Sequence, residues 1–223
     1  MVVQLHQVLS KKLCQAILAD LDRTPMKDGR KSAGSLGQNL KVNMQADSGS
    51  ETYKAMVKRV MSALQAHEEF KKSAMPRRIL PPLFSRYGPG SYYKRHIDNA
   101  FVGPFPAMRS DLSITIFLND PEEYDGGMLS LETPVGTQEY RLAQGDAVLY
   151  PTYWPHAVTD ITRGERKVVV TWVESLIREP QQREIISDLS NLMEWAVTQE
   201  LEFEQLLRIE KTRLNLMRMW ANT

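Results

Sequence analysis

The sequence predicts an α+β protein in which helices flank a β-rich core built as a sandwich, a barrel or a jelly roll. Apolar residues recur every three or four positions near both ends of the chain, which is typical of amphipathic helices. Between residues 76 and 178 the chain instead has short β-branched or alternating segments separated by turn signals, which is typical of strands. With 223 residues, 42% of them hydrophobic, the chain can form one domain with a core, or a core with a small satellite.

One helix is expected over residues 10–21 and a second over residues 53–70. Ser10 stands directly before the first apolar repeat, and serine caps helix N-termini well. The repeats are Leu13, Ile17, Leu18 and Leu21 in the first helix, and Met56, Val60 and Leu64 in the second. Residues 26–47 between them are rich in glycine, serine and other polar residues, so a loop or short strands are expected there.

The middle of the chain is expected to form the strands of the core. The predicted strands are Ile79–Tyr87, Leu112–Leu118, Met128–Leu131, Glu139–Leu142, Ala147–Tyr150 and Val168–Val173. Their separators are Gly88-Pro89-Gly90, Asp125-Gly126-Gly127, residues 134–137, Gln144-Gly145-Asp146 and Arg163-Gly164. Many short strands at close spacing favour two packed sheets or a closed barrel.

After Pro180 the helical spacing returns on a charged background, so two helices or one bent helix should cover a face of the sheet. We expect a core domain with its N-terminal helices over residues 1–178 and a helical extension over residues 179–223. Because the extension is long and amphipathic, a homodimer through these C-terminal helices is an open alternative to packing on the core.

Composition excludes several classes of protein. The chain has 28 Lys and Arg against 27 Asp and Glu, so binding to nucleic acid or to an anionic membrane has no general electrostatic support. A single cysteine, Cys14, rules out an internal disulfide and a four-cysteine zinc site. The chain has no secretory signal pattern at residues 1–13 and no apolar run long enough to span a bilayer, so no membrane partner and a cytoplasmic location are expected.

Two histidines and an aspartate form a candidate metal site. His96 and Asp98 follow an extended run, and residues two apart on a strand point to the same face. His156 lies sixty residues later, after another apolar segment, where a jelly roll could bring it opposite the first pair. Two imidazoles and one carboxylate leave open positions on an octahedral metal, as in the non-haem Fe(II) oxygenases. No catalytic residue is expected beyond this centre.

Arg166 is the candidate binding residue for a dicarboxylate. It opens an alternating strand, so its guanidinium shares an inward face with Val168, Val170 and Trp172 and needs an anionic partner. A carboxylate at the far end of 2-oxoglutarate would supply one through two parallel hydrogen bonds. Tyr87 is either a packing residue or a hydroxyl donor to the same cosubstrate. Arg109 and Asp111 are expected to form a local ion pair, and lining the mouth of the substrate site is the alternative role for them.

An ordered series of motifs resembles the PKHD-type hydroxylases, in the prolyl-4-hydroxylase-like branch of the Fe(II)/2-oxoglutarate-dependent dioxygenases. The motifs are Asp28-Gly29-Arg30 with Ala33-Gly34; Lys41, Asn43 and Gln45; Tyr87-Gly88-x-Gly90-x-x-Tyr93-x-x-His96-x-Asp98; Arg109-x-Asp111-Leu112-Ser113; Tyr124-Asp125-Gly126-Gly127; Gly145-Asp146 with Tyr150-Pro151; His156-x-Val158; Gly164-x-Arg166; and Leu216-Met217-Arg218-Met219-Trp220. The resemblance implies a double-stranded β-helix, iron bound by His96, Asp98 and His156, and 2-oxoglutarate bound by Arg166 and Tyr87. It also implies ascorbate as the reductant.

The expected function is therefore hydroxylation of an unidentified small-molecule or peptide substrate by O2, with release of succinate and CO2. Oxidative demethylation of a nucleobase is the alternative reaction, although the balanced charge disfavours it. A jelly-roll sensor that binds a metal or a dicarboxylate without catalysis is the alternative from another class. Residues 99–107, rich in glycine and proline, are expected to form a loop over the entrance, where substrate specificity is decided.

Overall fold

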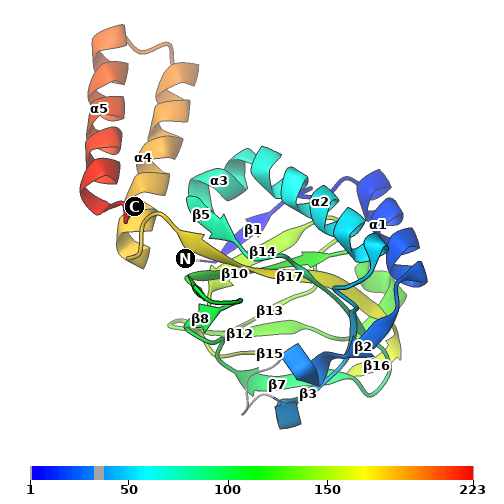
Figure 1. Cartoon of the computed structure of the whole chain (residues 1–223). Coiled ribbons are helices and arrows are strands. Elements are labelled where there is room, and N and C mark those ends of the chain that lie inside the picture. Colours follow the sequence, from blue (N-terminus) through cyan, green and yellow to red (C-terminus); the bar gives the residue numbers. More distant parts are fainter. Residues whose placement is uncertain (1, 33–37, 223) are drawn as a thin grey trace.

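The computed structural model describes residues 2–32 and 38–222; the Ala33-Gly34 pair of the motifs above lies outside them. Two antiparallel sheets stack face to face, and helices cover the outer face of the larger sheet (Figure 1). A helical hairpin at the C-terminal end projects away from this body. The predicted α+β class with a jelly-roll core is confirmed.

The helices are α1 (Lys11–Arg23), α2 (Glu51–Ala66), α3 (Glu68–Ala74), α4 (Pro180–Thr198) and α5 (Phe203–Trp220), and the short 3-10 turns are η1 (Gly29–Ser32), η2 (Gln38–Leu40) and η3 (Pro121–Glu123).

The larger sheet has the order β1 (Val3–Leu5), β14 (Ala147–Pro151), β10 (Leu112–Phe117), β17 (Arg166–Ser175), β6 (Leu83–Tyr87), β4 (Met44–Ala46) and β2 (Met26–Asp28), with β5 (Pro76–Ile79) also paired to β17. The smaller sheet has the order β13 (Gly136–Tyr140), β12 (Leu129–Thr133), β15 (His156–Val158), β7 (Tyr92–His96) and β3 (Lys41–Val42). Two ribbons complete the fold, β11 (Tyr124–Gly126) with β16 (Ile161–Gly164), and β8 (Phe101–Val102) with β9 (Met108–Arg109).

One expected strand is wrong. Residues 79–87 were expected to form a continuous strand, but the structure divides this stretch into β5 and β6. Pro81 and Pro82 lie in the gap, and proline lacks the N–H that a ladder hydrogen bond requires. The C-terminal segment forms two helices and not a single bent one. The short strands β2, β3 and β4 occupy the stretch for which a loop or short strands were expected.

Helices α1 and α2 pack on the larger sheet through the apolar repeats seen in the sequence. Ile17, Met56 and Val60 are fully buried in one cluster with the sheet residues Ile114 and Val169. Ser10 caps α1 as expected, because its side chain accepts a hydrogen bond from the backbone N–H of Leu13. Burial of these apolar faces is what holds the two helices against the sheet.

A second apolar cluster fills the space between the two sheets. It combines Phe117, Val148 and Val168 of the larger sheet with Leu129 and Leu131 of the smaller one. Neighbouring residues in β14 alternate between the two clusters, since successive strand side chains point to opposite faces. The interior of the sandwich is therefore mostly apolar, and any polar side chain buried there requires a hydrogen-bond partner or a ligand.

The helices α4 and α5 form an antiparallel hairpin, and α4 packs against α3 of the body (Figure 1). Ile177 and Ile186 are buried there against Met75, and Lys72 of α3 forms an ion pair with Glu194, 2.9 Å away. None of the described side chains of α5 is buried. The expectation that the extension covers a face of the sheet is therefore wrong. No helix in the described parts of the chain is long and apolar enough to cross a bilayer.

The turn at Gly164 permits only glycine. Its φ is 70°, and an added Cβ would lie 2.0 Å from the Glu123 carbonyl oxygen. Gly90 has a similar φ of 78°, but within the described residues no atom lies within 4 Å of its added Cβ.

Replacing Gly164 by Ala is therefore expected to lower the free energy of unfolding by at least about 2 kcal/mol, because backbone strain adds to a clash with the backbone. Gly90→Ala is the control and should cost only about 1 kcal/mol, since it adds strain without a clash. Urea denaturation of the two variants measures the difference. Equal losses would contradict the assigned clash.

Candidate metal centre

Two strands of the smaller sheet bring together the three residues singled out in the sequence. His96 ends β7 and lies directly opposite His156 of β15 in the antiparallel ladder, and Asp98 follows two residues later. Asp98 Oδ1 is 4.0 Å from His96 Nε2 and 3.8 Å from His156 Nε2. One ligand atom from each residue lies within 4.8 Å of the others. The three side chains are therefore arranged around one point, as a shared cation requires.

Backbone carbonyl groups orient both imidazole rings. His96 Nδ1 is 2.8 Å from the Lys94 carbonyl oxygen, and His156 Nδ1 is 2.9 Å from that of Trp154. A ring that donates from Nδ1 carries its free lone pair on Nε2, and this is the nitrogen that faces Asp98. Both rings are thus fixed in the tautomer that a metal ligand needs.

The environment of His96 keeps its ring neutral. Burial, and to a smaller extent the neighbouring His156 and Lys41, lower the pKa of His96 from its ordinary 6.5 to about 3, although the hydrogen bond to Lys94 acts in the opposite direction. A neutral imidazole can bind a metal ion, whereas an imidazolium cannot. His96, whose ring centroid lies 4.2 Å from that of His156, is therefore better suited to binding a cation than to carrying a proton.

Trp172 holds the third side chain of the cluster. Its indole Nε1 donates a hydrogen bond of 2.9 Å to Asp98 Oδ2, which leaves Oδ1 turned toward the two imidazoles. Sequence reasoning placed Trp172 on the same inward face of β17 as Arg166 but did not predict its hydrogen bond to Asp98. A contact between segments 74 residues apart leaves no local signal in the sequence.

Lys41 and Tyr93 form a wall beside His96. The Tyr93 ring stacks on the His96 ring with centroids 3.5 Å apart, and Lys41 Nζ lies 4.9 Å from the centroid of the Tyr93 ring. Burial lowers the pKa of Lys41 to about 8, although the charges of Asp98 and Asp28 oppose the shift. Sequence reasoning quoted Lys41 as part of a motif but did not place it beside the candidate metal ligands.

Arg166 lies inside the sandwich, at the start of β17 and opposite Tyr87 of β6. Only 1% of its surface is exposed, and its guanidinium carbon lies 5.2 Å from the ring centroid of Tyr87 and 5.5 Å from that of Phe117. Among the described residues no carboxylate forms an ion pair with it. Gly127 permits this placement, because a Cβ there would lie 2.9 Å from Arg166 Cδ. A buried cation without an anion is costly, so the arrangement favours an anionic ligand.

Several polar groups of the interior lack a well-formed hydrogen bond. Within the described residues these are Arg166 Nε, the Tyr124 hydroxyl, Ser113 Oγ and the Asn43 side-chain amide, although Arg166 lies near the Tyr124 hydroxyl, Asn43 near that of Tyr87 and Ser113 near that of Tyr150. Burial raises the pKa of both Tyr87 and Tyr150, so their phenols stay protonated and can donate hydrogen bonds. Buried polar groups are almost always satisfied, so this set favours a polar ligand in the same interior.

The expected ion pair between Arg109 and Asp111 is present. Arg109 Nε and Nη2 donate to the two carboxylate oxygens of Asp111 over 2.7 and 2.8 Å. The expected entrance loop contains the short ribbon β8–β9, so it is partly ordered by strand pairing. Phe105 in this loop is 97% exposed.

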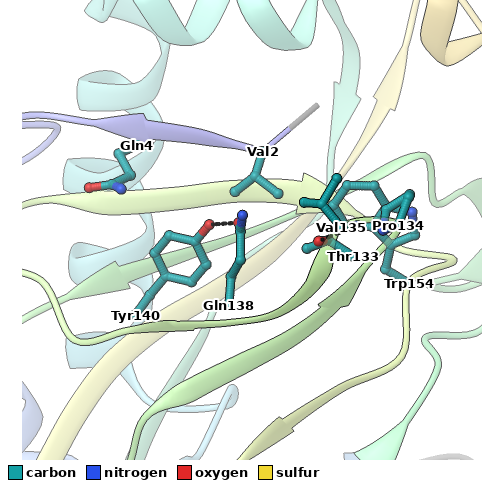
Figure 2. A pocket seen from close by; sticks show the side chains of 8 residues that line it. All are labelled: Val2, Gln4, Thr133, Pro134, Val135, Gln138, Tyr140 and Trp154. Atoms are coloured by element: carbon teal, nitrogen blue, oxygen red, sulfur yellow. Dashed lines mark hydrogen bonds between the residues drawn. The ribbon is translucent and has the colours of Figure 1, made fainter.

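Two cavities lie near the sandwich. One, of about 660 Å³, is lined by Asp98, Phe101, Arg109, Tyr153 and Arg183 among others, so it joins the His-Asp-His cluster to the start of α4. The other, of about 540 Å³, opens between the edge strands β1 and β13 (Figure 2). None of the three cluster residues lines the second cavity, and its lining residues include Val2, Gln138 and Tyr140.

Comparison with known sequences identifies close relatives along the whole chain. Residues 82–174 match the 2OG-Fe(II) oxygenase superfamily. A PKHD-type hydroxylase of Acidovorax ebreus is 38% identical over 225 residues, which covers 99% of both chains. One of Klebsiella pneumoniae is 37% identical and covers 96% of both.

Comparison with solved structures shows the same fold. A prolyl-4-hydroxylase of Pseudomonas putida aligns with a TM-score of 0.52 at 20% identity, over 78% of this chain and 92% of that one. A prolyl hydroxylase of Trichoplax adhaerens aligns with a TM-score of 0.54 at 13% identity, over 77% and 82% of the two chains. The sandwich described above is therefore the jelly roll of 2-oxoglutarate oxygenases.

Replacing Trp172 by Phe is expected to weaken Co(II) binding about tenfold, because Asp98 loses the donor that orients it while the aromatic body is kept. Competition with a chromophoric chelator measures the affinity. Trp195→Phe, at a half-exposed position of α4, is the control and should bind Co(II) as the wild type does. Unchanged affinity in Trp172→Phe would contradict the orienting role.

The metal-free protein is expected to become less stable as the pH falls from about 7 to about 5. His96 has a folded pKa of about 3 and an ordinary value of 6.5, so in this range the unfolded chain binds the extra proton. The loss from this residue should be roughly 1–2 kcal/mol. Urea denaturation of the wild type and of His96→Gln at both pH values measures how much of the lost free energy of unfolding is due to His96. An equally steep slope in His96→Gln would disprove the assignment.

Proposed function

The chain belongs to the PKHD-type hydroxylases of the 2OG-Fe(II) oxygenase superfamily, and we propose that His96, Asp98 and His156 bind its Fe(II) while Arg166 and Tyr87 bind 2-oxoglutarate. As a member of this family the protein is an enzyme, a 2-oxoglutarate-dependent dioxygenase. The observation that carries the assignment is the buried guanidinium of Arg166, which has no anionic partner among the described residues and lies among unpartnered polar groups.

The donor set fits iron with open positions. Two imidazole nitrogens and one carboxylate oxygen are the ligands of the non-haem Fe(II) oxygenases, and three protein ligands leave room for a chelating cosubstrate and for O2. When bound together, iron, 2-oxoglutarate and O2 supply the oxidation that hydroxylates the substrate and releases succinate and CO2. The primary substrate is an unidentified small molecule or peptide.

The protein's own residues would bind and orient these groups. The guanidinium of Arg166 can donate two parallel hydrogen bonds to a carboxylate, and its charge persists at any pH the fold tolerates. The phenol of Tyr87, buried beside it, can donate a third. The unpartnered hydroxyl groups of Tyr124 and Ser113 are further donors in the same interior. Trp172 keeps the Asp98 carboxylate in place while the substrate approaches.

The two alternative functions were a non-enzymatic sensor and a nucleobase demethylase. Membership in an enzyme family decides against a non-enzymatic sensor. Demethylation of a nucleobase has no supporting observation, because the formal charge of +1 provides no excess of cations for a phosphate backbone. Hydroxylation is therefore the reaction that we propose.

Four further expectations stay predictions. The division into a core domain of residues 1–178 and an extension of residues 179–223 is supported by the projecting hairpin. The homodimer through the C-terminal helices is supported by exposed apolar side chains such as Trp195, Phe203 and Leu207. Ascorbate as reductant follows from the family resemblance alone. The fourth is the cytoplasmic location.

Adding 2-oxoglutarate to the Fe(II) protein without oxygen is expected to produce the weak visible absorption of a chelated keto acid. In Arg166→Met, which keeps the volume and removes the charge, half-saturation should need at least about 100-fold more 2-oxoglutarate, because two charge-assisted hydrogen bonds are lost. Arg163→Met, at an exposed ion pair, is the matched control and should titrate as the wild type does. An unchanged titration in Arg166→Met would refute the role of Arg166, and absence of the band in the wild type would refute the function.

A further inference from the structure

We propose that the cavity between Asp98 and the start of α4 is the substrate site and that Arg183 there binds a carboxylate of a small, largely apolar substrate. The inference rests on the proposed function, since it assigns a substrate class to that same centre. Arg166 does not line this cavity, so the substrate and 2-oxoglutarate would bind to different arginines.

Two distant parts of the chain form this cavity. The jelly roll contributes one side, with Asp98 from the metal cluster and Phe101 from the ribbon β8–β9. The helical extension contributes the other, with Arg178, Glu179 and Arg183 at and before the first turn of α4. A molecule held at the α4 end can therefore extend toward Asp98, where oxidation would take place.

Arg183 is a buried cation whose charge is not neutralised. Only 4% of its surface is exposed, and its Nη1 donates hydrogen bonds to the carbonyl oxygens of Ile177 and Arg178 over 2.8 and 2.7 Å. In the described parts of the chain no carboxylate lies within ion-pair distance of it. These two bonds use one of its nitrogens, and the others remain available to a ligand.

The other charges at this end of the cavity leave one positive charge in excess. Arg109 and Asp111 neutralise each other through their bidentate pair. Arg178 and Arg183 then face the single carboxylate of Glu179. Helix α4 also points its N-terminus at the cavity, with no side chain capping it, and this end of a helix favours anions.

The volume of this cavity and its aromatic lining residues indicate what the rest of the ligand is like. A volume of about 660 Å³ is typical of sites for small molecules and not of grooves for folded partners. Phe101 and Tyr153, 65% and 52% exposed, present aromatic surface to this cavity. A carboxylate with an apolar or aromatic body matches both features.

The competing explanation is that Arg183 only holds α4 to the end of β17. Removing a purely structural arginine would lower stability and would weaken all ligands alike. A carboxylate-binding arginine instead sets the preference for an acid over the matching neutral amide. The acid-to-amide affinity ratio therefore separates the two roles.

The probes are 3-phenylpropanoate and 3-phenylpropanamide, titrated by calorimetry into the full-length protein loaded with Zn(II) and saturating N-oxalylglycine, an unreactive analogue of 2-oxoglutarate. The wild type should bind the acid at least about tenfold more tightly than the amide. Arg183→Gln should bind the two equally. Arg208→Gln, which removes the same charge from an exposed position of α5 outside the cavity, should keep the wild-type preference.

Glu179→Gln tests the inference without disturbing a buried residue. This substitution removes the negative charge that opposes an anionic ligand at the cavity. The affinity for 3-phenylpropanoate should therefore rise a few-fold, and the affinity for 3-phenylpropanamide should stay the same. Equal binding of acid and amide by the wild type, no binding of either, or a preference retained in Arg183→Gln would overturn the inference. Failure of N-oxalylglycine itself to bind would refute the proposed function, which is a separate outcome.

Discussion

The antiparallel pairing of β7 with β15 is the constraint on which the centre depends. It places His156 opposite His96, although sixty residues separate them in the chain, and Asp98 follows at the end of the same strand. Side chains alternate along a strand, so a slip of one residue in this ladder would turn an imidazole away from the other two ligands. The pairing of β17 with β6 acts in the same way for Arg166, which lies opposite Tyr87. The smaller sheet thus positions the proposed metal ligands, and the larger sheet positions the buried cation Arg166.

Buried polar groups of this fold are of two kinds. Those around Arg109 and Asp111 are tightly paired, whereas those around Arg166 lack partners in the described parts of the chain. Arg109 and Asp111 are joined by two hydrogen bonds, and Asp111 also accepts a hydrogen bond from the backbone of Ser175. Arg166 and the hydroxyl groups around it have no such partners within the described residues. Fully paired networks stiffen a fold, whereas unsatisfied groups are tolerated where a ligand completes them. The contrast separates structural polar residues from ligand-binding ones on physical grounds.

Sequence reasoning predicted much of the candidate site but not its surroundings. The spacing of His96 and Asp98, and the alternation that begins at Arg166, are local patterns that a strand makes visible. Trp172 and Lys41 contact the cluster or its neighbours through pairings between strands far apart in the chain, and a tryptophan or lysine alone is an ordinary residue. The break between β5 and β6 was missed because apolar residues flank Pro81 and Pro82 and dominated the pattern.

The sequence by itself determined the elements, because apolar periodicity and turn residues act over a few positions. It determined the two N-terminal helices, most strands of the core, and the residue types able to bind a metal and a dicarboxylate. Only the tertiary structure decided where the C-terminal helices lie, since an amphipathic pattern shows which face of a helix is apolar but not which surface that face contacts. They project as a hairpin whose base, near Arg183, closes a cavity that reaches Asp98. That cavity joins residues 85 positions apart, and contacts of this kind arise from packing and leave no local pattern in the chain.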